Sequence, residues 1–299
     1  MSRVEVGVQE HPGRSAWPVR AGRRAGLGRL ARRNPVVVIG AGLIIAVVLV
    51  ALAAQVIAPY NPVSQIAQPL LLPGGRHVAG TDELGRDELS RLIFGARVSL
   101  YVGILAVSIA LALGATSGII AGFYGGWLDN VLMRAMDILF SLPAIVLAIT
   151  ITSILKPSLT NAMIAIGIVY APTFARIARG PTLAVVNLAY IEAARAVGAP
   201  NWKIMLQHVL PNVSAPLIVQ TTVSLSTAIL TEAALSFLGL GTQPPTASWG
   251  LMLSTARQYM LIDPWIAIFP GVAIALTVLG FNLLGDGLRD LLDPRIRTI

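Results

Sequence analysis

The sequence lacks several residue types and motifs on which large classes of enzymes depend. None of its 299 residues is a cysteine, so neither a disulfide framework nor thiolate chemistry can carry the function. The three histidines, His11, His77 and His208, lie too far apart in sequence to form a metal-ligand pattern. A phosphate-binding G-x-x-x-x-G-K-[ST] loop is also missing, so we do not expect this chain to hydrolyse ATP. We therefore expect no metal and no cofactor to be bound by the chain itself.

Charged residues are scarce as well, because Asp, Glu, Lys and Arg together make up only 12% of the chain. Hydrophobic residues make up 55%, and the mean hydropathy of +0.75 is well above that of soluble domains. The net charge of +8 suggests nucleic acid binding, but eight arginines lie within the first 33 residues, directly before the first apolar run. Membrane proteins carry positive charge at such positions. The composition therefore predicts a membrane protein that contacts lipid and has no nucleic acid partner.

Apolar runs predict an all-α polytopic protein with six transmembrane helices. A helix needs roughly 20 apolar residues to cross the hydrocarbon core of a bilayer. Five runs reach or approach this length, namely 36–57, 100–120, 138–155, 162–178 and 266–284. A sixth run, 215–240, is long enough but carries many polar side chains, so we expect it inside a bundle or beside a substrate pathway. Its candidate residues for contacts with a pathway or a second subunit are Gln220, Thr221, Ser224, Thr227 and Glu232.

The distribution of Lys and Arg predicts the orientation of these spans. Six spans place both termini on the same side, and that side carries 16 of the 22 Lys and Arg residues. The positive-inside rule then puts both termini in the cytoplasm, with a basic segment at 1–35 and a tail at 285–299. A cleaved signal sequence is an alternative for the N-terminus, since Arg23 and Arg24 precede the first apolar run. That run is about 22 residues long, which exceeds the usual apolar region of a signal peptide.

Two other classes of membrane protein can be compared with this pattern. Intramembrane hydrolases need a nucleophile with a His or Lys base, a pair of carboxylates, or a metal cluster. No predicted span contains a His or Lys, and none has two carboxylates at helical spacing. A proton-coupled transporter is the remaining alternative, because Glu232 lies in a span and could carry a proton. A structural hydrogen bond or an ion pair with a second subunit is the favoured interpretation of Glu232.

A polar island, "YIEAARAVGAPNWKIMLQHVLPN" at residues 190–212, interrupts the apolar runs on the predicted cytoplasmic side. Its first half predicts a helix from about Leu188 to Val197. Gly198 should end that helix, because glycine accepts the left-handed backbone conformation. We expect Asn201 to cap a second helix that covers 202–210 and ends before Pro211.

One face of this second predicted helix is apolar, because Trp202, Met205, Leu206 and Val209 recur at helical spacing. A helix pair with such a face needs a surface on which to pack. This pattern is consistent with two interpretations. The helix pair is either a connector that rests on the membrane surface or a docking site for another protein.

The segment "GTDELGRDELSRLIFGARVSL" at residues 80–100 combines four acidic residues with bases. Leu89, Leu92, Ile93 and Ala96 follow helical spacing, which predicts an amphipathic helix along the outer membrane interface before the second span. Within that span, glycines recur at every fourth position. Such a row lets another helix approach closely, although glycine is common in membrane helices in general. The glycines are Gly114, Gly118 and Gly122.

The polar island resembles the EAA motif of ABC importer permeases. In that motif, EAA is followed by Gly after three residues and by I-x-L-P after nine more. The isoleucine position of the motif is His208 here, and "HVLPN" is similar to the form found in permeases of dipeptide, oligopeptide and nickel importers. Residues 80–100, 232–241 and 248–250 resemble the C-type permease of the same group. The likeness runs from about residue 30 to the C-terminus, and the matching positions of the motif are Glu192, Ala193, Ala194, Gly198, His208, Leu210 and Pro211.

The resemblance implies a type I ABC importer permease fold and a transport function rather than an enzymatic one. In this family, two permease subunits form the pathway, and two cytoplasmic ATPase subunits bind ATP and Mg. An extracytoplasmic binding protein delivers the substrate. The loop at 188–212 would then be the coupling helix that contacts an ATPase subunit. Its candidate coupling residues are Glu192, Ala193, Ala194, Gly198, Trp202, His208, Leu210 and Pro211.

The resemblance also predicts how the chain is divided and where it works. Residues 36–99 would form the first transmembrane helix and an extracytoplasmic loop with the amphipathic helix, and residues 100–284 a five-helix permease core. The expected location is a bacterial inner membrane. Di- or oligopeptides are the first expectation for the substrate, and nickel, glutathione or another small solute are the alternatives.

Overall fold

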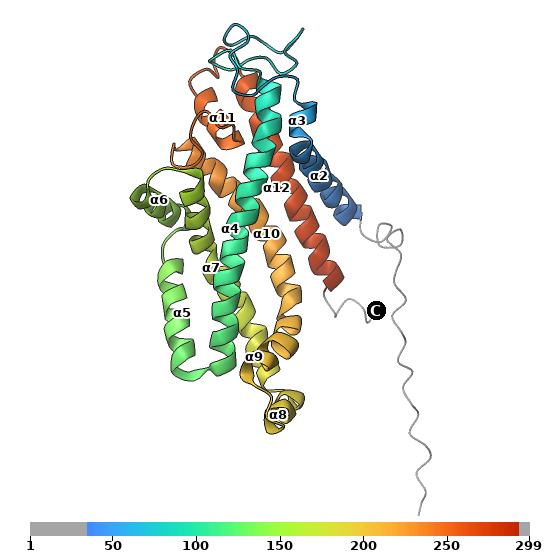
Figure 1. Ribbon diagram of the computed structural model, residues 1–299, viewed down its shortest axis with the longest axis vertical. Helices are drawn as coiled ribbons and strands as arrows, with labels where there is room; N and C mark the ends of the chain where they lie inside the picture. The colour runs from blue at the N-terminus through green and yellow to red at the C-terminus, as the bar shows by residue number, and fades with distance from the viewer. Residues whose placement is uncertain (1–34, 293–299) are drawn as a thin grey trace, which may run out of the picture.

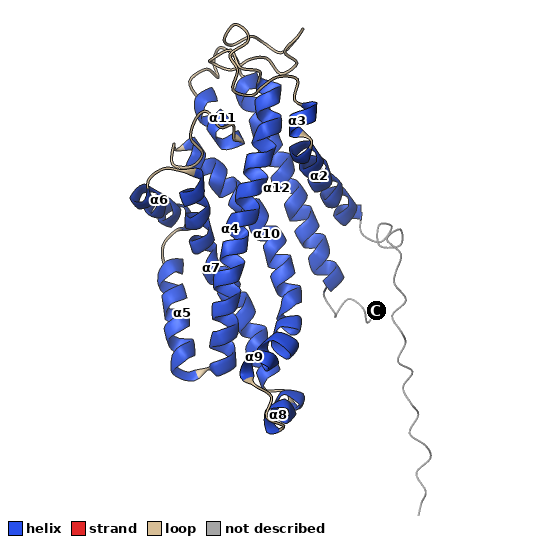
Figure 2. Ribbon diagram, viewed as in Figure 1, coloured by secondary structure: helices blue, strands red, loops and turns tan. Residues whose placement is uncertain are grey.

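The chain folds into a bundle of helices, seen in a computed structural model that describes residues 35–292 (Figure 1). The predicted basic segment, apart from its last residue, and the end of the predicted tail lie outside these residues. No strand is present among the described residues (Figure 2), which agrees with the predicted all-α fold. The helices are α2 Pro35–Leu52, α3 Ala54–Ile57, α4 Glu88–Tyr124, α5 Gly126–Phe140, α6 Ala144–Leu155, α7 Leu159–Val186, α8 Ala189–Ala196, α9 Asn201–Ile204, the π-helical turn η1 Met205–Val209, α10 Leu210–Phe237, α11 Trp249–Ala256 and α12 Trp265–Leu292.

Five helical stretches in the described part of the chain are long and apolar enough to cross a membrane. They comprise α2, α4, α7, α12 and the continuous run from α9 to α10, and a sixth span results if α5 and α6 are counted as one. This agrees with the six predicted spans when the bent pair is included. Half of the large apolar side chains on α2 are exposed and the other half only partly buried, as expected for a helix that faces lipid.

The third predicted span is not one straight helix, so that prediction is wrong. α5 ends at Phe140, and α6 starts at Ala144 after a bend of 91°. Pro143 occupies the position before α6, where its missing N–H cannot continue the hydrogen bonding of α5. In Figure 1, α5 runs beside α4, and α6 turns away to the side of the bundle.

The structure does not contain a separate amphipathic helix before the second span within residues 58–99. Instead, α4 is one continuous helix of 37 residues that begins at Glu88 and includes the second span. Asp87 caps it, because its carboxylate accepts hydrogen bonds from Ser90 N (2.8 Å) and Ser90 Oγ (2.7 Å). Glu88 and Arg91 in its first turn are buried, which is incompatible with a helix lying on an interface. The predicted boundary at residue 99 therefore falls inside α4.

Helices α4 and α7 pack at very short distance along the predicted glycine row. A Cβ at Gly114 or Gly118 would overlap with the carbonyl oxygens of Ala171 or Ala175 in α7, and at Gly122 it would lie 2.9 Å from Thr182 Cβ. The row therefore serves close helix packing, which confirms the sequence-based prediction. α4, α7 and α10 share one hydrophobic core, and α2 packs on α12 at the edge.

Two ion pairs connect α5 with α7. Arg179 contacts both carboxylate oxygens of Asp129, each at 2.6 Å, and Arg176 lies 2.7 Å from Asp137. The guanidinium of Arg176 also lies over the ring of Phe140 at 4.1 Å. These contacts keep α5 on α7 up to the point where the chain bends into α6.

The molecule has two distinct ends (Figure 1). We call the end that carries residues 58–87 and α11 the loop end, and the end that carries α8 and η1 the α8 end. α4 extends from the loop end towards the α8 end, so it connects the two.

Candidate functional site

At the α8 end, the chain forms the predicted short helix and glycine turn. α8 covers Ala189–Ala196, and Gly198 has a φ of +81°, a conformation that other residues adopt only with strain. Gly198 N donates to Arg195 O and Ala199 N donates to Ala194 O, each at 3.0 Å. This pair of hydrogen bonds is a Schellman motif, which ends a helix with defined geometry. The direction in which the chain leaves α8 is therefore set by the turn.

The second half of the polar island differs from the prediction. Pro200, not Asn201, precedes α9, and Asn201 is the first residue of that helix. The helix also does not end before Pro211, because it passes through the π-helical turn η1 directly into α10. Leu210 N donates to Met205 O, five residues back, and this wider turn accommodates Pro211, which has no N–H to donate. The segment at the α8 end is thus rigidly continuous with a membrane-spanning helix.

The wider turn also changes which side chains face the bundle. Ile204 and Val209 are five residues apart, and both are fully buried in the core shared by α4, α7 and α10. Trp202 and Leu206, which we predicted in one stripe with Val209, are 62% and 56% exposed. The prediction assumed 3.6 residues per turn throughout, whereas a π turn rotates the following residues relative to that period.

The eight candidate coupling residues all lie close together in sequence and structure at the α8 end. Ala194 and His208 are half-buried there. The guanidinium of Arg195, in the same helix as Glu192, lies over the ring of Phe123. The exposed members are Glu192, Ala193, Gly198, Trp202, Leu210 and Pro211.

The candidate residues in α10 fall into two groups. Ser224 and Glu232 are buried inside the subunit, with 1% and 0% of their surfaces exposed. Gln220, Thr221 and Thr227 are half-buried. Gln220 donates to Ser224 Oγ at 3.0 Å, and it lines a cavity of ≈ 630 Å³ between α7, α10 and α12. The hydroxyls of Thr221 and Thr227 donate to carbonyls of their own helix. Their hydrogen-bonding capacity as donors is therefore used without a second subunit.

Glu232 is held by hydrogen bonds within its own chain. Its Oε1 atom accepts from Ser236 Oγ at 2.7 Å and from Thr242 Oγ1 at 3.1 Å. Because the side chain is fully buried in this subunit, an ion pair with a second subunit is not available to it. Of the two roles predicted for Glu232 as a structural residue, the geometry favours the hydrogen bond.

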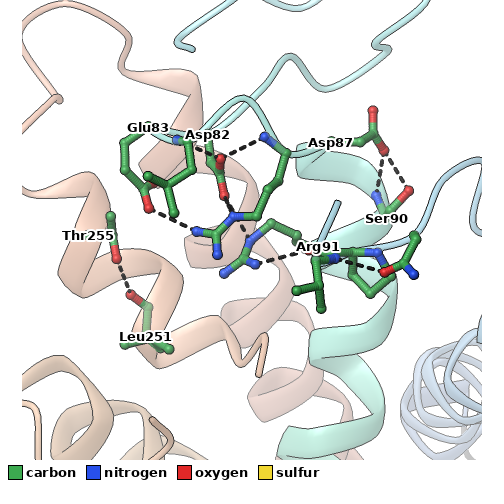
Figure 3. Close-up of polar contacts among 12 residues, drawn as sticks. Asp82, Glu83, Asp87, Ser90, Arg91, Leu251 and Thr255 are labelled. Atoms are coloured by element: carbon green, nitrogen blue, oxygen red, sulfur yellow. Dashed lines mark hydrogen bonds and ion pairs between the residues drawn. The ribbon is translucent and has the colours of Figure 1, made fainter. Parts of the chain in front are cut away.

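The loop end contains a buried ionic cluster that the sequence-based reasoning missed (Figure 3). Asp82 Oδ2 contacts Arg86 Nε at 2.5 Å and Arg91 Nε at 3.1 Å, and Arg86 Nη2 contacts Glu83 at 2.8 Å. Arg91 also donates to Pro62 O at 3.1 Å, which holds the start of the loop on α4. The balance of acids and bases in residues 80–100 was visible in the sequence, but their burial was not.

Burial affects protonation in this cluster. It raises the pKa of Glu83 above the usual value, an effect that the charge of Asp82 reinforces and that Arg86 opposes. A second contact lies beside it, where His77 Nδ1 is 2.8 Å from Asp87 Oδ1. Across the described residues, no group of three or more His, Cys, Asp or Glu side chains has metal-binding geometry. The cluster connects the loop to α4 rather than forming a metal site.

Comparison with known families identifies the chain. Residues 114–298 match the family described as "Binding-protein-dependent transport system inner membrane component". Residues 29–73 match the N-terminal transmembrane domain of oligopeptide transport permease C.

This chain therefore belongs to the binding-protein-dependent transport permease family. Members of this family are inner membrane components of transport systems and are not enzymes, as the sequence predicted. The family description also implies that the chain works in a system with other proteins, among them a binding protein.

Individual relatives cover nearly the whole chain. The dipeptide transport system permease protein DppC of Alkalihalophilus pseudofirmus is 45% identical over 272 residues, which are 89% of this chain and 88% of the relative. The di/tripeptide permease DppC of Pseudomonas aeruginosa is 48% identical and covers 84% of this chain and 86% of its own. The glutathione transport system permease protein GsiD of Pectobacterium atrosepticum is 44% identical, with 88% of each chain covered.

A solved structure shares the fold of the permease. A chain of the MetNI methionine ABC transporter, solved in inward-facing conformations, superposes with a TM-score of 0.54 over 68% of this chain and 96% of its own. The identity is 20%, so this likeness concerns the fold alone. It confirms the predicted type I ABC importer permease fold.

Proposed function

We propose that this permease forms half of the substrate pathway of an ATP-driven importer and transmits the movement of an ATPase to that pathway. The observation that carries this proposal is the two-sided segment at the α8 end. Its inner side, with Ile191, Ile204 and Val209, belongs to the core of the bundle. Trp202, Leu206 and the charged Glu192 of the same segment are exposed. Such a surface fits a groove on another protein, because exposed aromatic and aliphatic side chains are typical anchors of interfaces.

The proposed assembly follows from the family and from the orientation of the chain. The complex would comprise a second permease, two ATPase subunits that bind ATP and Mg, and an extracytoplasmic binding protein. The excess of Lys and Arg supports a cytoplasmic location of both termini and of the α8 end. The α8 end would then face the ATPase, and the loop end would face the binding protein.

Di- or tripeptides are the proposed substrate class, since two of the relatives above are named as dipeptide or di/tripeptide permeases. Glutathione is the second candidate, because a relative of nearly the same identity is named as a glutathione permease. Both substrates are short peptides with a free amino group and carboxylates, so one pathway chemistry could accept either.

The proposal can be tested by uptake in cells that lack the permease and its partners, with and without the complete set of subunits. We expect uptake of a labelled dipeptide that vanadate inhibits and that persists after addition of an uncoupler while ATP is kept constant. Competition with excess glutathione and with nickel separates the substrate candidates. Uptake that stops with the uncoupler and ignores vanadate would support a proton-coupled transporter instead.

A further inference from the structure

Helix α8 is held on the bundle by side-chain packing as well as by its covalent connections. Ile191 on its inner side is fully buried and belongs to the same core cluster as Val185, Ile204 and Val213. The turn at Gly198 and the short link at Leu188 connect α8 to its neighbours in sequence. A helix of eight residues with a single buried anchor could still tilt about that anchor. Its orientation therefore depends on side-chain contacts to other helices.

The first of these contacts is made by Tyr190. Its ring lies 5.8 Å from the ring of His208 in η1, at an angle of 61°. Asn212 in α10 donates to Tyr190 Oη at 3.4 Å and to His208 O at 2.6 Å. Tyr190 thus connects α8 with the beginning of α10, on the far side of the glycine turn.

The second contact is made by Arg195. Its guanidinium carbon lies 5.2 Å from the centre of the Phe123 ring, which belongs to the last turn of α4 and is buried. This is a cation–π contact between α8 and α4. Because Tyr190 and Arg195 are five positions apart, they leave α8 about 140° from each other around its axis.

These contacts connect α8 to two membrane-spanning helices in two directions. A tilt of α8 about Ile191 would have to move the beginning of α10, the end of α4, or both. α4 in turn is packed on α7 along its glycine row, so a movement of α4 extends to the rest of the core. Tyr190 and Arg195 belong to α8, whereas the exposed Trp202 and Leu206 belong to α9 and η1.

We infer that Tyr190 and Arg195 are positioning residues that pass the movement of α8 to α10 and α4, while other side chains bind the ATPase. This inference rests on the proposed function. It distinguishes binding of the ATPase from transmission, and it assigns these two tasks to different residues of the same short loop.

The test uses the complete importer in proteoliposomes, with ATP hydrolysis and peptide uptake measured in the same vesicles. Tyr190→Ala and Arg195→Gln should each lower the number of peptides imported per ATP by about two- to fivefold, the ratio that corresponds to a contact of this strength. Tyr190→Phe and Arg195→Lys, which keep the ring or the charge, should retain most of the coupling. Arg134→Gln is the matched control, since Arg134 on α5 is exposed and forms no ion pair in the described part of the chain.

Co-purification of the ATPase with each variant separates the outcomes. The amount of co-purified ATPase should be unchanged in all variants. Loss of the ATPase from Tyr190→Ala or Arg195→Gln would mean that these residues bind the ATPase, and this result would overturn the inference. Unchanged import per ATP in both variants would overturn it as well. If Gly198→Val leaves uptake intact, the proposed function itself fails, and not only this inference.

A second measurement reports the transmission directly. The chain has no cysteine, so two cysteines introduced at Ala196 and Tyr124, both exposed, can carry spin labels without further changes to this chain. We expect one narrow distance distribution between α8 and α4 that shifts little between the nucleotide-free and vanadate-trapped importer. In Arg195→Gln the distribution should become broad. An equally narrow distribution in that variant would contradict a positioning role of Arg195.

Discussion

The loop end and the α8 end differ in where their charged residues lie. At the loop end, Asp82, Arg86 and Arg91 are buried and contact one another. At the α8 end, Glu192 and Lys203 are exposed, and apolar side chains are exposed beside them. Charges of the first kind hold a long loop on its own subunit, whereas those of the second kind remain available to another protein. The difference supports a structural role for the charges at the loop end and agrees with the binding role proposed for the α8 end.

The backbone of the two ends supports the same distinction. Residues 58–87 form a long connection with few regular elements, and buried side chains hold it in place. The α8 end is built from a Schellman turn and a continuous helix, and the contacts of Tyr190 and Arg195 orient α8 on this frame. A segment with this geometry can transmit a displacement, because it does not bend freely between α8 and α10.

The largest effect should follow from a change at the glycine turn. Gly198→Val places a β-branched residue at a φ of +81°, which strains or opens the turn. We expect ATP-dependent uptake to fall to background while insertion into the membrane is unchanged. The matched control is Gly75→Val at the loop end, where φ is +52° and no atom lies within 4 Å of an added Cβ. Equal loss of uptake in both variants would show that strain alone, at either end, stops transport.

The second effect concerns stability rather than transport. Asp82→Asn leaves Arg86 and Arg91 buried without their shared carboxylate, which should cost about 3–5 kcal/mol. In a thermal unfolding experiment this corresponds to a decrease in Tm of roughly 5–8 °C for a protein of this size. Glu192→Gln at the α8 end should change Tm very little, because its carboxylate is exposed. Similar decreases in Tm for both variants would contradict the difference between the ends.

A smaller effect is expected for the exposed apolar pair at the α8 end. Changing Trp202 and Leu206 together to Ala should weaken binding of the ATPase by roughly 30-fold, the effect of losing one interface hot spot. Tm should stay constant, since both side chains are exposed. Leu72→Ala with Val78→Ala at the loop end is the control, because these side chains are similarly exposed. If that pair weakened ATPase binding equally, the assignment of the ends would be reversed or unfounded.

The smallest effect is expected at Glu232, which is buried like Asp82 but contacts hydroxyl groups instead of arginines. Glu232→Gln keeps an oxygen that accepts from Ser236 and Thr242, so stability should change by about 1 kcal/mol or less. Uptake and its dependence on pH should be those of the unchanged importer. A lost or shifted pH profile of uptake would revive the interpretation of Glu232 as a proton carrier.

The sequence was a good guide where local chemistry decides the structure. Gly198 ends α8 as predicted, because its left-handed conformation is a property of glycine in that position. The glycine row of α4 was recognisable from spacing alone, although only the structure shows that α7 occupies it. The apolar runs likewise indicated the spans, since bilayer thickness sets their length.

Predictions from the sequence were wrong where contacts with neighbouring helices determine the local structure. Pro211 looked like the end of a helix, but a π turn provides the space that its ring needs, and the helix continues. Leu89, Leu92, Ile93 and Ala96 looked like the apolar stripe of an interfacial helix. Their polar neighbours proved to be buried, and this requires partners from a distant part of the chain, such as Pro62.

The order of residues was enough to establish that this chain crosses a membrane several times and that a polar segment with a glycine turn interrupts its apolar runs. Hydrophobicity, charge bias and glycine conformation are local properties, so they can be read from residues in order. Which charges are buried and which remain exposed depends on packing between segments that are distant in the sequence. Asp82 and Glu192 are equally acidic in the sequence, and the difference between them lies in what packs around each carboxylate.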